Sequence, residues 1–449
     1  MIPSNNSEAA MAEDLATNAE GDQSVKKVKK KKKRKSRRRR RVTQEDILAS
    51  RYVHDWVFPD SPIEDEEVLV GVPAKRAGRV VFELHSHSTC SDGFLSPSAL
   101  VERAHKNGVK VLALTDHDTM DGIAEAMEAA RKLDIRIIPG VEISAVCSPR
   151  DESEAEEPVH ILAYYGSWGP ARFEELEKLL AKIRDGRYIR AKEILLKLSK
   201  LEMPLKFEHV SKIAGNGVAP GRLHVARAMV EAGYVENLKQ AFSRYLYDGG
   251  PAYATGSEPV AEAVVQLISH TGGISALAHP WALKNPVAII RKLKTAGLHA
   301  IEVYRSDGKL SGFSDLADVY ELVKLGGSDY HGRSGHEEPD VGSVDLPVLA
   351  VFEFLKLARP LWCKAMKEIL STLPIEPSED DVVKIIRFGN LTDLKGFSSM
   401  SCGKDLLGPC LESWLTIEEK EASELESMRV KLLHTIVGTG GYQMTPVSR

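Results

Sequence analysis

The sequence has few of the features that mark secreted, disulfide-stabilised or membrane-spanning proteins. Its five cysteines are scattered and odd in number, and none has zinc-finger spacing, which suits a reducing compartment (Cys90, Cys147, Cys363, Cys402, Cys410). No run of about 18 apolar residues occurs, so no transmembrane helix is predicted. The N-terminus is polar and acidic and lacks the apolar segment of a signal peptide. We therefore expect an intracellular protein without a membrane partner.

The near-neutral net charge of −4 hides a strongly basic tract at residues 26–41, "KKVKKKKKRKSRRRRR". This tract carries 14 positive charges, so the rest of the chain carries −18. An acidic body argues against a general nucleic-acid binder and tolerates multivalent cations. The tract itself is typical of a nuclear or nucleolar address, of an electrostatic tether for short RNA, or of a solvated tail without a specific role. It has no interleaved aromatic residues, so base stacking is not indicated.

From residue 79 onward, short apolar runs alternate with helical patterns. The runs that we read as strands are 80–84, 109–115, 135–144, 160–165, 272–278, 299–304 and 324–328. Among the helices, the segment 96–108 has Ser96 as N-cap, Pro97 at the first helical position and Gly108 after its end. This alternation predicts an α/β protein with a parallel sheet or barrel.

The same patterns divide the chain into four regions. Residues 1–75 are expected to be a disordered arm that contains the basic tract, with a short helix near 43–56. Residues 79–345 form the barrel domain, and residues 166–256 are a helical insertion within it. Residues 346–449 are a weakly structured C-terminal extension with one amphipathic segment, 351–370.

Side chains of the types that bind metals follow most of the predicted strands. They lie at the ends of five runs, where the strands of an α/β barrel converge on one mouth. His160 instead begins its run, and it reaches the mouth only if that strand runs in the opposite direction. The candidate ligands are His85, His87, Asp92, His117, Glu142, His160, His279, Asp329 and His331.

Imidazoles suit zinc, manganese and iron, and carboxylates can bridge hard cations. Nine ligands exceed one tetrahedral shell and suit two or three ions, a cluster that makes hydroxide near neutral pH and clamps a phosphate. Taken singly, each candidate has an ordinary alternative. Asp118 or Thr119 could cap a helix, Glu142 could form a salt bridge at the rim, and His279 could be a turn residue.

A phosphatase also needs cations for its substrate. The segment "APGRLHVARAMVEAG" begins a helix near Arg222, where free amides favour an anion, and His224 adds a side-chain donor. Arg187 falls on the apolar stripe of its predicted helix, so it points inward. The alternatives are a surface charge for Arg222 and a snorkelling side chain for Arg187. Asp116 is a candidate for orienting water or the leaving group, or for supporting a ligand histidine.

The ordered string "HSHSTCSDG…TDHDT…PGVEIS…HILAYY…AHP…IEVY…GSDYH" resembles the polymerase and histidinol phosphatase (PHP) superfamily over residues 79–335. The helical insertion is similar to that of the nucleotide-phosphatase branch, which includes 3′,5′-nucleoside bisphosphate phosphatase and the 5′–3′ exoribonuclease ribonuclease AM. The resemblance implies a distorted (β/α)7 barrel and a trinuclear site, often of manganese, with zinc or iron as alternatives. Carried over motif by motif, the ligands would be the nine residues named above.

Together these observations predict a metal-dependent phosphoesterase that hydrolyses a nucleotide phosphate by attack of metal-bound hydroxide. Asp116, Arg222 and His224 are the catalytic candidates, and Arg187, Arg222 and His224 the substrate-binding ones. A 5′–3′ exoribonuclease acting on short 5′-phosphorylated RNA, a histidinol-phosphate phosphatase and a non-catalytic nucleic-acid-associated protein are the alternatives.

Overall fold

The computed structural model describes residues 42–58, 80–148, 156–215, 217–308, 312–333 and 338–371. The basic tract at 26–41, the acidic loop within 147–158 and the chain after residue 371 fall largely or wholly outside these ranges. Predictions about the structure of those segments therefore stay predictions.

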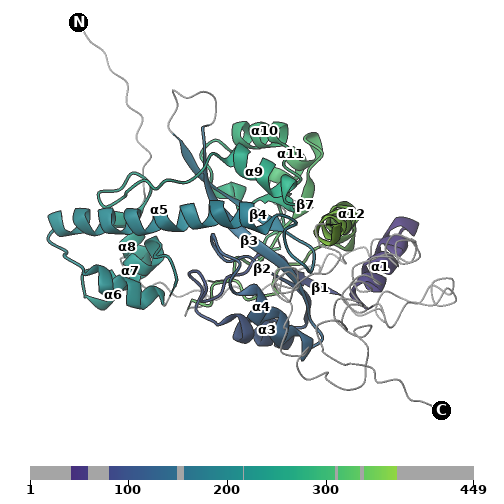
Figure 1. The fold of residues 1–449 in the computed structure, drawn as a ribbon, viewed down its shortest axis with the longest axis horizontal. Coiled ribbons are helices and arrows are strands. Elements are labelled where there is room, and N and C mark those ends of the chain that lie inside the picture. Colours follow the sequence, from purple (N-terminus) through teal and green to yellow (C-terminus); the bar gives the residue numbers. More distant parts are fainter. Residues whose placement is uncertain are drawn as a thin grey trace, which may run out of the picture. The chain divides into compact units, whose positions relative to one another are not determined.

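Seven strands form one sheet in which spatial order follows chain order (Figure 1). They are β1 (Val81–Glu83), β2 (Val109–Leu114), β3 (Arg136–Cys147), β4 (Glu157–Tyr164), β5 (Ile274–Leu277), β6 (Ala300–Glu302) and β7 (Val323–Leu325). Strand β4 is antiparallel to both of its neighbours, and the other neighbouring pairs are parallel. Each predicted apolar run coincides with one strand, which confirms the α/β prediction.

The two outermost strands meet beyond their C-terminal ends. Ser86, after β1, bridges Tyr330, after β7, in parallel register. The His87 amide donates to the Tyr330 carbonyl over 2.9 Å, and the Asp329 amide donates to the His85 carbonyl over 3.0 Å. The sheet is therefore drawn closed at the edge where its strands end, as a distorted barrel requires.

One face of the sheet packs against helices that follow the strands. These are α3 (Pro97–Lys106), α4 (Ile123–Arg131), α9 (Ala261–His270), α10 (Pro286–Ala296) and α11 (Phe313–Val319). Helix α3 begins as its sequence predicts, with the Ser96 hydroxyl accepting from the Ala99 amide and Pro97 in the first turn. The alternating pattern of each strand supplies this core, for example through Leu112 and Leu114 of β2.

The opposite face of the sheet is covered by segments from both ends of the described chain, α1 (Gln44–Val57) and α12 (Val348–Ser371). Thr43 and Asp46 form a capping box that starts α1, and Trp56 is only 3 % exposed. Helix α12 buries Phe354, and its Trp362 donates from Nε1 to the Tyr164 carbonyl over 3.1 Å.

Both end helices coincide with predicted segments, α1 with the short helix near 43–56 and α12 with the amphipathic segment 351–370. Their packing against the sheet, where they share one core with it, was not predicted. The physical reason is that their apolar side chains find partners far away in sequence, which local periodicity does not reveal.

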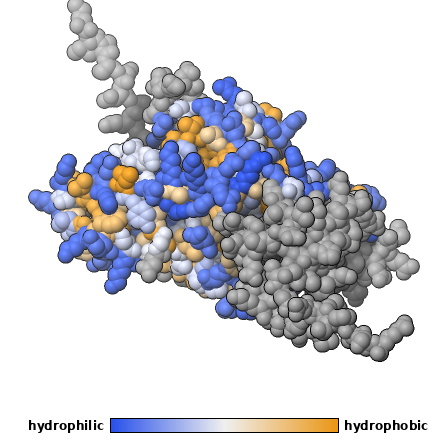
Figure 2. All heavy atoms as spheres, in the orientation of Figure 1, coloured by the Kyte–Doolittle hydropathy of each residue, from blue (hydrophilic) through white to orange (hydrophobic). Residues whose placement is uncertain are grey.

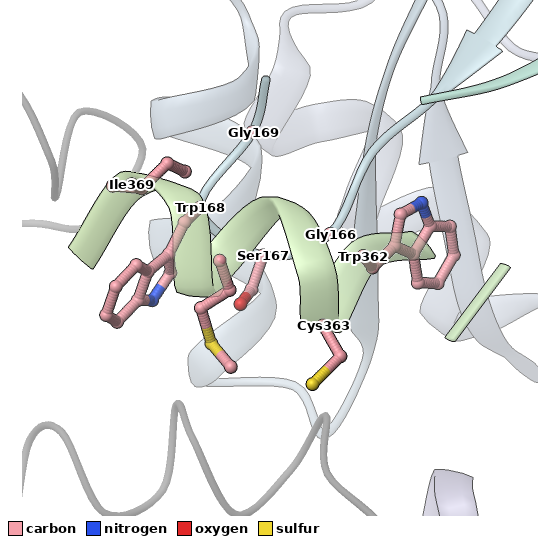
Figure 3. A pocket seen from close by; sticks show the side chains of 8 residues that line it. Gly166, Ser167, Trp168, Gly169, Trp362, Cys363 and Ile369 are labelled. Atoms are coloured by element: carbon pink, nitrogen blue, oxygen red, sulfur yellow. The ribbon is translucent and has the colours of Figure 1, made fainter. Parts of the chain in front are cut away.

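The seam between α12 and the 166–169 turn after β4 is tightly filled (Figure 3). Trp362, Cys363 and Ile369 line it from the helix, and the free volume is about 10 Å³. That volume is about one water molecule, so the seam is a packing contact rather than a ligand site.

Between β4 and α9 the chain forms a helical subregion with its own small core. It contains α5 (Phe173–Lys200), α6 (Phe207–Ala214), α7 (Arg222–Glu231), α8 (Leu238–Ala241) and η1 (Phe242–Leu246). Helix α5 extends away from the sheet, and α6 to α8 lie along its far part (Figure 1). The visible surface mixes hydrophilic residues with hydrophobic ones around these helices (Figure 2). Among the described residues, no helix is both long and apolar enough to span a membrane.

Candidate metal centre

The loop that follows β1 carries His85, His87 and Asp92 and is held in place by one buried carboxylate. Asp116 accepts from the Ser88 amide over 2.7 Å and from the Ser88 and Ser91 hydroxyls over 2.6 Å each. The loop turns back so sharply that a Cβ on Gly93 would lie 2.5 Å from the His87 carbonyl oxygen. Glycine is therefore required at this position for steric reasons.

These contacts favour the alternative reading of Asp116, a residue that supports the ligands, and its catalytic role stays a prediction. Both of its oxygens accept hydrogen bonds from loop serines, and it is 1 % exposed. Burial raises the pKa of Asp116, and the serine hydrogen bonds oppose that rise. Asp116 thus holds the loop that bears the histidines through Ser88 and Ser91.

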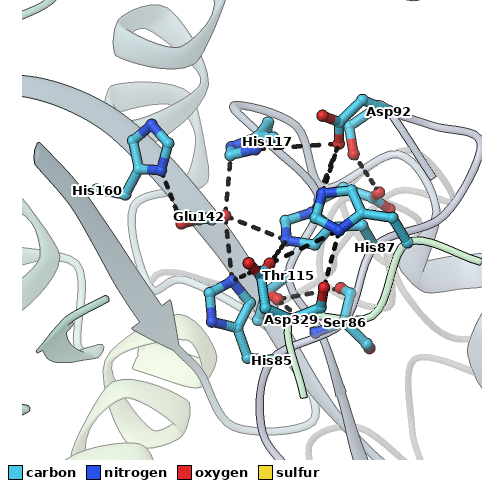
Figure 4. Close-up of polar contacts among 12 residues, drawn as sticks. His85, Ser86, His87, Asp92, Thr115, His117, Glu142, His160 and Asp329 are labelled. Carbon is cyan, nitrogen blue, oxygen red and sulfur yellow. Dashed lines mark hydrogen bonds and ion pairs between the residues drawn. The ribbon is translucent and has the colours of Figure 1, made fainter. Parts of the chain in front are cut away.

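The carboxylate of Glu142 lies at the centre of the candidate ligands (Figure 4). Its Oε2 is 3.2 Å from Nε2 of both His85 and His87, and 3.3 Å from Nδ1 of His117. Its Oε1 is 2.9 Å from Nδ1 of His160 and 3.0 Å from Nε2 of His279. Five imidazoles around one carboxylate are far more than a rim salt bridge needs.

The remaining carboxylates extend the cluster on either side. Asp329 Oδ1 lies 3.2 Å from His87 Nε2 and 3.3 Å from His85 Nε2, and Asp92 Oδ1 lies 3.3 Å from His331 Nε2. Three groups of potential ligand atoms result: His85, His87, Glu142 and Asp329; His87, Asp92, His117 and His331; and His117, Glu142 and His160. The structure brings all nine predicted residues together, with His279 beside the third group.

Buried atoms that lack hydrogen-bond geometry test whether these residues fit metal ions. Both ring nitrogens of His87, Nδ1 of His117 and Oδ1 of Asp92 are buried and make no hydrogen bond, although oppositely charged or imidazole groups lie 3.2–4.0 Å away. An unsatisfied buried polar atom costs about 1–3 kcal/mol, so four of them in one cluster need compensation. Ions held by nitrogen and carboxylate ligands would supply it, so the residues present fit a multinuclear metal centre.

His160 lies on β4 and His279 follows β5, and these two strands run in opposite directions. Strand β4 is antiparallel, and its His160 pairs with Ser144 of β3, so a residue near the start of β4 lies where β3 ends. The antiparallel direction of β4 is the condition under which His160 was expected to reach the mouth. His279 has φ 29°, and Asp329 has φ 53°. Such backbone is uncommon for residues other than glycine and concentrates at functional sites.

Two buried glutamates that the sequence analysis missed support the ligands. Glu302 is 3.1 Å from His85 Nδ1 and accepts from the His279 amide over 2.7 Å. Glu83 accepts from the amides of His85 and Ser328 over 3.1 and 2.9 Å. Both end their strands, so the signal was an acidic residue inside an apolar run, in "VVFEL" and "HAIEVY".

The electrostatics of the cluster favour bound positive charge. Burial lowers the pKa of His85, but the carboxylates of Glu142, Glu302 and Asp329 outweigh this and raise it well above its usual value. For His117 burial dominates and lowers the pKa to about 3, so the imidazole is neutral, as a ligand must be. The carboxylates thus attract a positive charge, which either a proton or a metal ion can provide.

A cavity of about 210 Å³ adjoins the cluster, and four arginines, Arg187, Arg190, Arg222 and Arg333, help to line it. Asp92, His117 and His160 also contribute to its walls, so it opens directly onto the candidate ligands. Arg190, three residues after Arg187 on α5, was missed, although this spacing places the two side by side on the helix surface.

Each of the two predicted arginines has a carboxylate partner. Arg187 is 9 % exposed and donates to Asp118 Oδ2 over 2.7 Å and to the Ser144 hydroxyl over 2.8 Å. Asp118 therefore pairs with Arg187 instead of capping a helix. Arg222 donates to Asp248 over 2.5 Å and to the Leu246 carbonyl over 3.2 Å.

His224 lies at the start of α7, but not in the form expected. Its Nδ1 accepts from the amide of the N-cap residue Gly221 over 2.9 Å. Burial lowers its pKa to about 4. A neutral ring adds no positive charge but keeps one N–H donor, so contact of His224 with phosphate stays a prediction.

Comparisons with known proteins agree with this geometry. The PHP domain model matches residues 83–246. The 5′-3′ exoribonuclease of Haemophilus influenzae is 34 % identical over 57 % of this chain and 91 % of its own length. The 3′,5′-nucleoside bisphosphate phosphatase of Chromobacterium violaceum is 32 % identical over 64 % of this chain and 97 % of its own.

Solved structures show the same fold. A protein of Bifidobacterium adolescentis, provisionally described as a metal-dependent phosphoesterase, aligns with TM-score 0.54 and 27 % identity over 62 % of this chain and 96 % of its own. An amidohydrolase of Chromobacterium violaceum with bound sulfate aligns with TM-score 0.54 and 30 % identity over 61 % and 96 %. From its motifs, its barrel and these relatives, the chain belongs to the PHP family and is a metal-dependent hydrolase with the PHP phosphoesterase fold.

Proposed function

We propose that this protein hydrolyses a phosphate monoester of a nucleotide, with a 3′,5′-nucleoside bisphosphate as the substrate class. One observation carries the proposal: the ligand cluster opens into a cavity that four arginines line. A bisphosphate carries two anionic groups on one small molecule. One can bind at the metal centre while the other binds the arginines of the adjoining cavity. The Chromobacterium violaceum relative, named for a substrate of this kind, adds support.

In this proposal the nine candidate ligands hold two or three ions, with Mn²⁺ preferred and Zn²⁺ or Fe²⁺ as alternatives. When bound, such ions act as Lewis acids on a phosphate and lower the pKa of a coordinated water. The protein contributes the rest. Glu142 holds the imidazoles around one point, while Glu302 and Glu83 fix His85, so the ligands are oriented before substrate arrives.

The arginines bind the second phosphate in the adjoining cavity. Arg222 is 29 % exposed at its side chain and can exchange its Asp248 contact for a phosphate oxygen. Arg187 is more committed, because Asp118 takes its Nε and one terminal nitrogen. Its Nη1 would lie 3.2 Å from a Cβ built on Gly221, so this nitrogen faces the start of α7. Arg190 is committed in the same way, because it pairs with the mostly buried Glu258. We assign phosphate contact to Arg222, and a supporting contact to Arg187 and Arg190.

The alternatives have less support. A histidinol-phosphate substrate has a single phosphate and leaves the arginine-lined cavity without a role. A non-catalytic role leaves the buried ligand atoms of His87 and Asp92 unexplained. Hydrolysis of short RNA would use the same centre. Its substrate differs from a bisphosphate in carrying a further nucleotide beyond the scissile bond.

The direct test is an assay of the Mn²⁺-loaded protein on adenosine 3′,5′-bisphosphate, with histidinol phosphate and an aryl phosphate in parallel. We expect the bisphosphate to have the highest specificity constant. A histidinol phosphate value equal to or above it would contradict the proposal. The variant His87→Ala, assayed in the same way, shows whether turnover comes from this centre rather than from a contaminant.

We further propose that the basic tract acts outside the active site, as a nuclear or nucleolar address or as a tether for RNA in an intracellular protein. Fourteen cations would release many counterions on binding RNA, so retention should fall steeply with salt. Deleting residues 26–41 should change cellular location or RNA retention and leave turnover of a mononucleotide intact. Loss of mononucleotide turnover would place the tract in the active site and refute this proposal.

A further inference from the structure

A second and larger cavity lies against the candidate metal centre, and the function proposed above does not use it. Its volume is about 690 Å³, and its lining includes Asp329, Glu302, Trp281, Arg305 and Arg333. This volume falls within the range of pockets that enclose small ligands.

The two cavities flank the same cluster and have one side chain in common. Asp92, His117 and His160 line the arginine-rich cavity, whereas Asp329 lines the larger one. Arg333 lines both. A ligand that occupies both cavities would therefore run past the candidate metal ligands. The part of the ligand that joins its two halves would lie beside Arg333.

The larger cavity is lined by the exposed aromatic ring of Trp281. Trp281 lies two residues after His279 in the short helix η2 (Pro280–Ala282). The Arg305 guanidinium carbon lies 4.8 Å from the centroid of its ring, a cation–π contact. Trp281 is still 37 % exposed, whereas the other tryptophans in the described ranges, Trp56, Trp168 and Trp362, are buried.

The charge of Arg305 is also largely available. Its ion pair with Asp307 is long, 3.9 Å, and both side chains are 40 % exposed. An exposed aromatic ring next to a weakly paired cation is the combination on which single-stranded nucleic acids bind, through base stacking and phosphate attraction.

We propose that Trp281 and Arg305 form a subsite for a second nucleotide, so that a short single-stranded RNA lies across the metal centre. One nucleotide occupies the arginine-lined cavity, the next base stacks on Trp281, and Arg333 lies beside the connecting phosphate. This inference rests on the proposed function and extends its substrate class from a mononucleotide to a short chain.

The test compares two substrates in the Mn²⁺-loaded full chain: adenosine 3′,5′-bisphosphate and the 5′-phosphorylated dinucleotide pApA. The variants are Trp281→Ala and, as the matched control that keeps an aromatic ring, Trp281→Phe. Stacking on an aromatic side chain is worth roughly five- to a hundredfold in affinity. We expect Trp281→Ala to lower the ratio of the specificity constants, pApA over bisphosphate, by at least about fivefold, and Trp281→Phe to restore most of it.

A second measurement does not depend on turnover. Saturating pApA added to protein stripped of metal should quench the tryptophan fluorescence of the wild type, and Trp281→Phe should abolish that quench. Equal losses on both substrates, an unchanged ratio, no quench, or the same quench in Trp281→Phe would each overturn the subsite. If the wild type hydrolyses neither nucleotide, the proposed function fails while the fluorescence measurement still decides whether Trp281 stacks a base.

Discussion

Arg187 and Asp118 form a buried ion pair in which Nε of the arginine donates to Oδ2 of the aspartate over 2.7 Å. Burial raises the pKa of Asp118, but the charge of Arg187 outweighs this and holds the pKa below its usual value. The pair ties the long helix α5 to the segment after β2. It therefore connects the helical subregion to the part of the barrel that carries His117.

Removing one member of this pair should destabilise the protein strongly. Arg187→Met leaves a buried carboxylate without its partner, at a cost of about 3–5 kcal/mol in the free energy of unfolding. The double variant with Asp118→Asn should recover much of that loss. Urea denaturation measures both. As control, Lys110→Met breaks the exposed pair with Asp134 and should cost about 1 kcal/mol or less; equal losses at the two sites would contradict the interpretation.

Removing bound metal should abolish hydrolysis and lower the melting temperature, because ions that bind only the folded state stabilise it. Elemental analysis of the Mn²⁺-loaded protein should find two to three ions per chain. Asp329→Ala should lose metal as well as rate, whereas Asp185→Ala, on the exposed side of α5, should lose neither. Full activity in strong chelator without bound metal would refute the metal centre.

Glu302→Gln should weaken metal binding although Glu302 is not among the candidate ligands. Its two oxygens contact His85 Nδ1 and the His279 amide, and an amide group cannot serve both in the same way. Loss of such a supporting partner typically costs about 10- to 100-fold in metal affinity or activity. Titration with a competing chelator measures the affinity. The exposed Glu102→Gln is the control, and unchanged affinity in Glu302→Gln would show that the ligands need no such support.

Arg222→Ala should discriminate between substrates. A lost charge-assisted hydrogen bond is worth about 1.5–3 kcal/mol, so the specificity constant for adenosine 3′,5′-bisphosphate should fall roughly ten- to a hundredfold. An aryl phosphate, with one phosphate, should be affected far less, and metal content should stay normal. Arg244→Ala removes an exposed charge from the nearby η1 segment as control. Equal losses on the two substrates would show that Arg222 does not bind a second phosphate.

Phe354→Ala should destabilise the protein without changing the metal ligands. Phe354 is 0 % exposed in the core between α12 and the sheet, and truncating a buried phenylalanine costs about 3–5 kcal/mol. Leu196→Ala, where the side chain is 65 % exposed, should change the unfolding free energy by about 0.5 kcal/mol or less. A small effect of Phe354→Ala would mean that α12 is not part of the cooperative core.

The strands and the ligand set could be read from the sequence because both leave local signals. Apolar runs marked every strand, and His or acidic residues directly after them marked the mouth. His160 is a clear case, since its place at the start of a run implied the reversed β4 that the structure contains.

What the sequence did not reveal depends on partners distant in the chain. Glu302 looked like an ordinary residue of a strand, and only the fold brings it to His85, 217 positions away. The hydrogen bonds that Asp116 accepts from the loop and the burial that lowers the pKa of His224 also come from the fold. Side-chain type can be read locally, but protonation and hydrogen-bond partners cannot.

The position of α12 also has a consequence for biosynthesis. Every candidate ligand lies between His85 and His331, whereas the helix that covers the second face of the sheet spans Val348–Ser371. Because translation runs from the N-terminus, all ligands leave the ribosome before that helix does, and the nascent sheet still exposes apolar residues such as Ile274 and Leu162. A chain that terminates before Val348 would thus contain every candidate ligand and expose the apolar face that α12 normally covers. Such a chain is prone to aggregate or to bind chaperones.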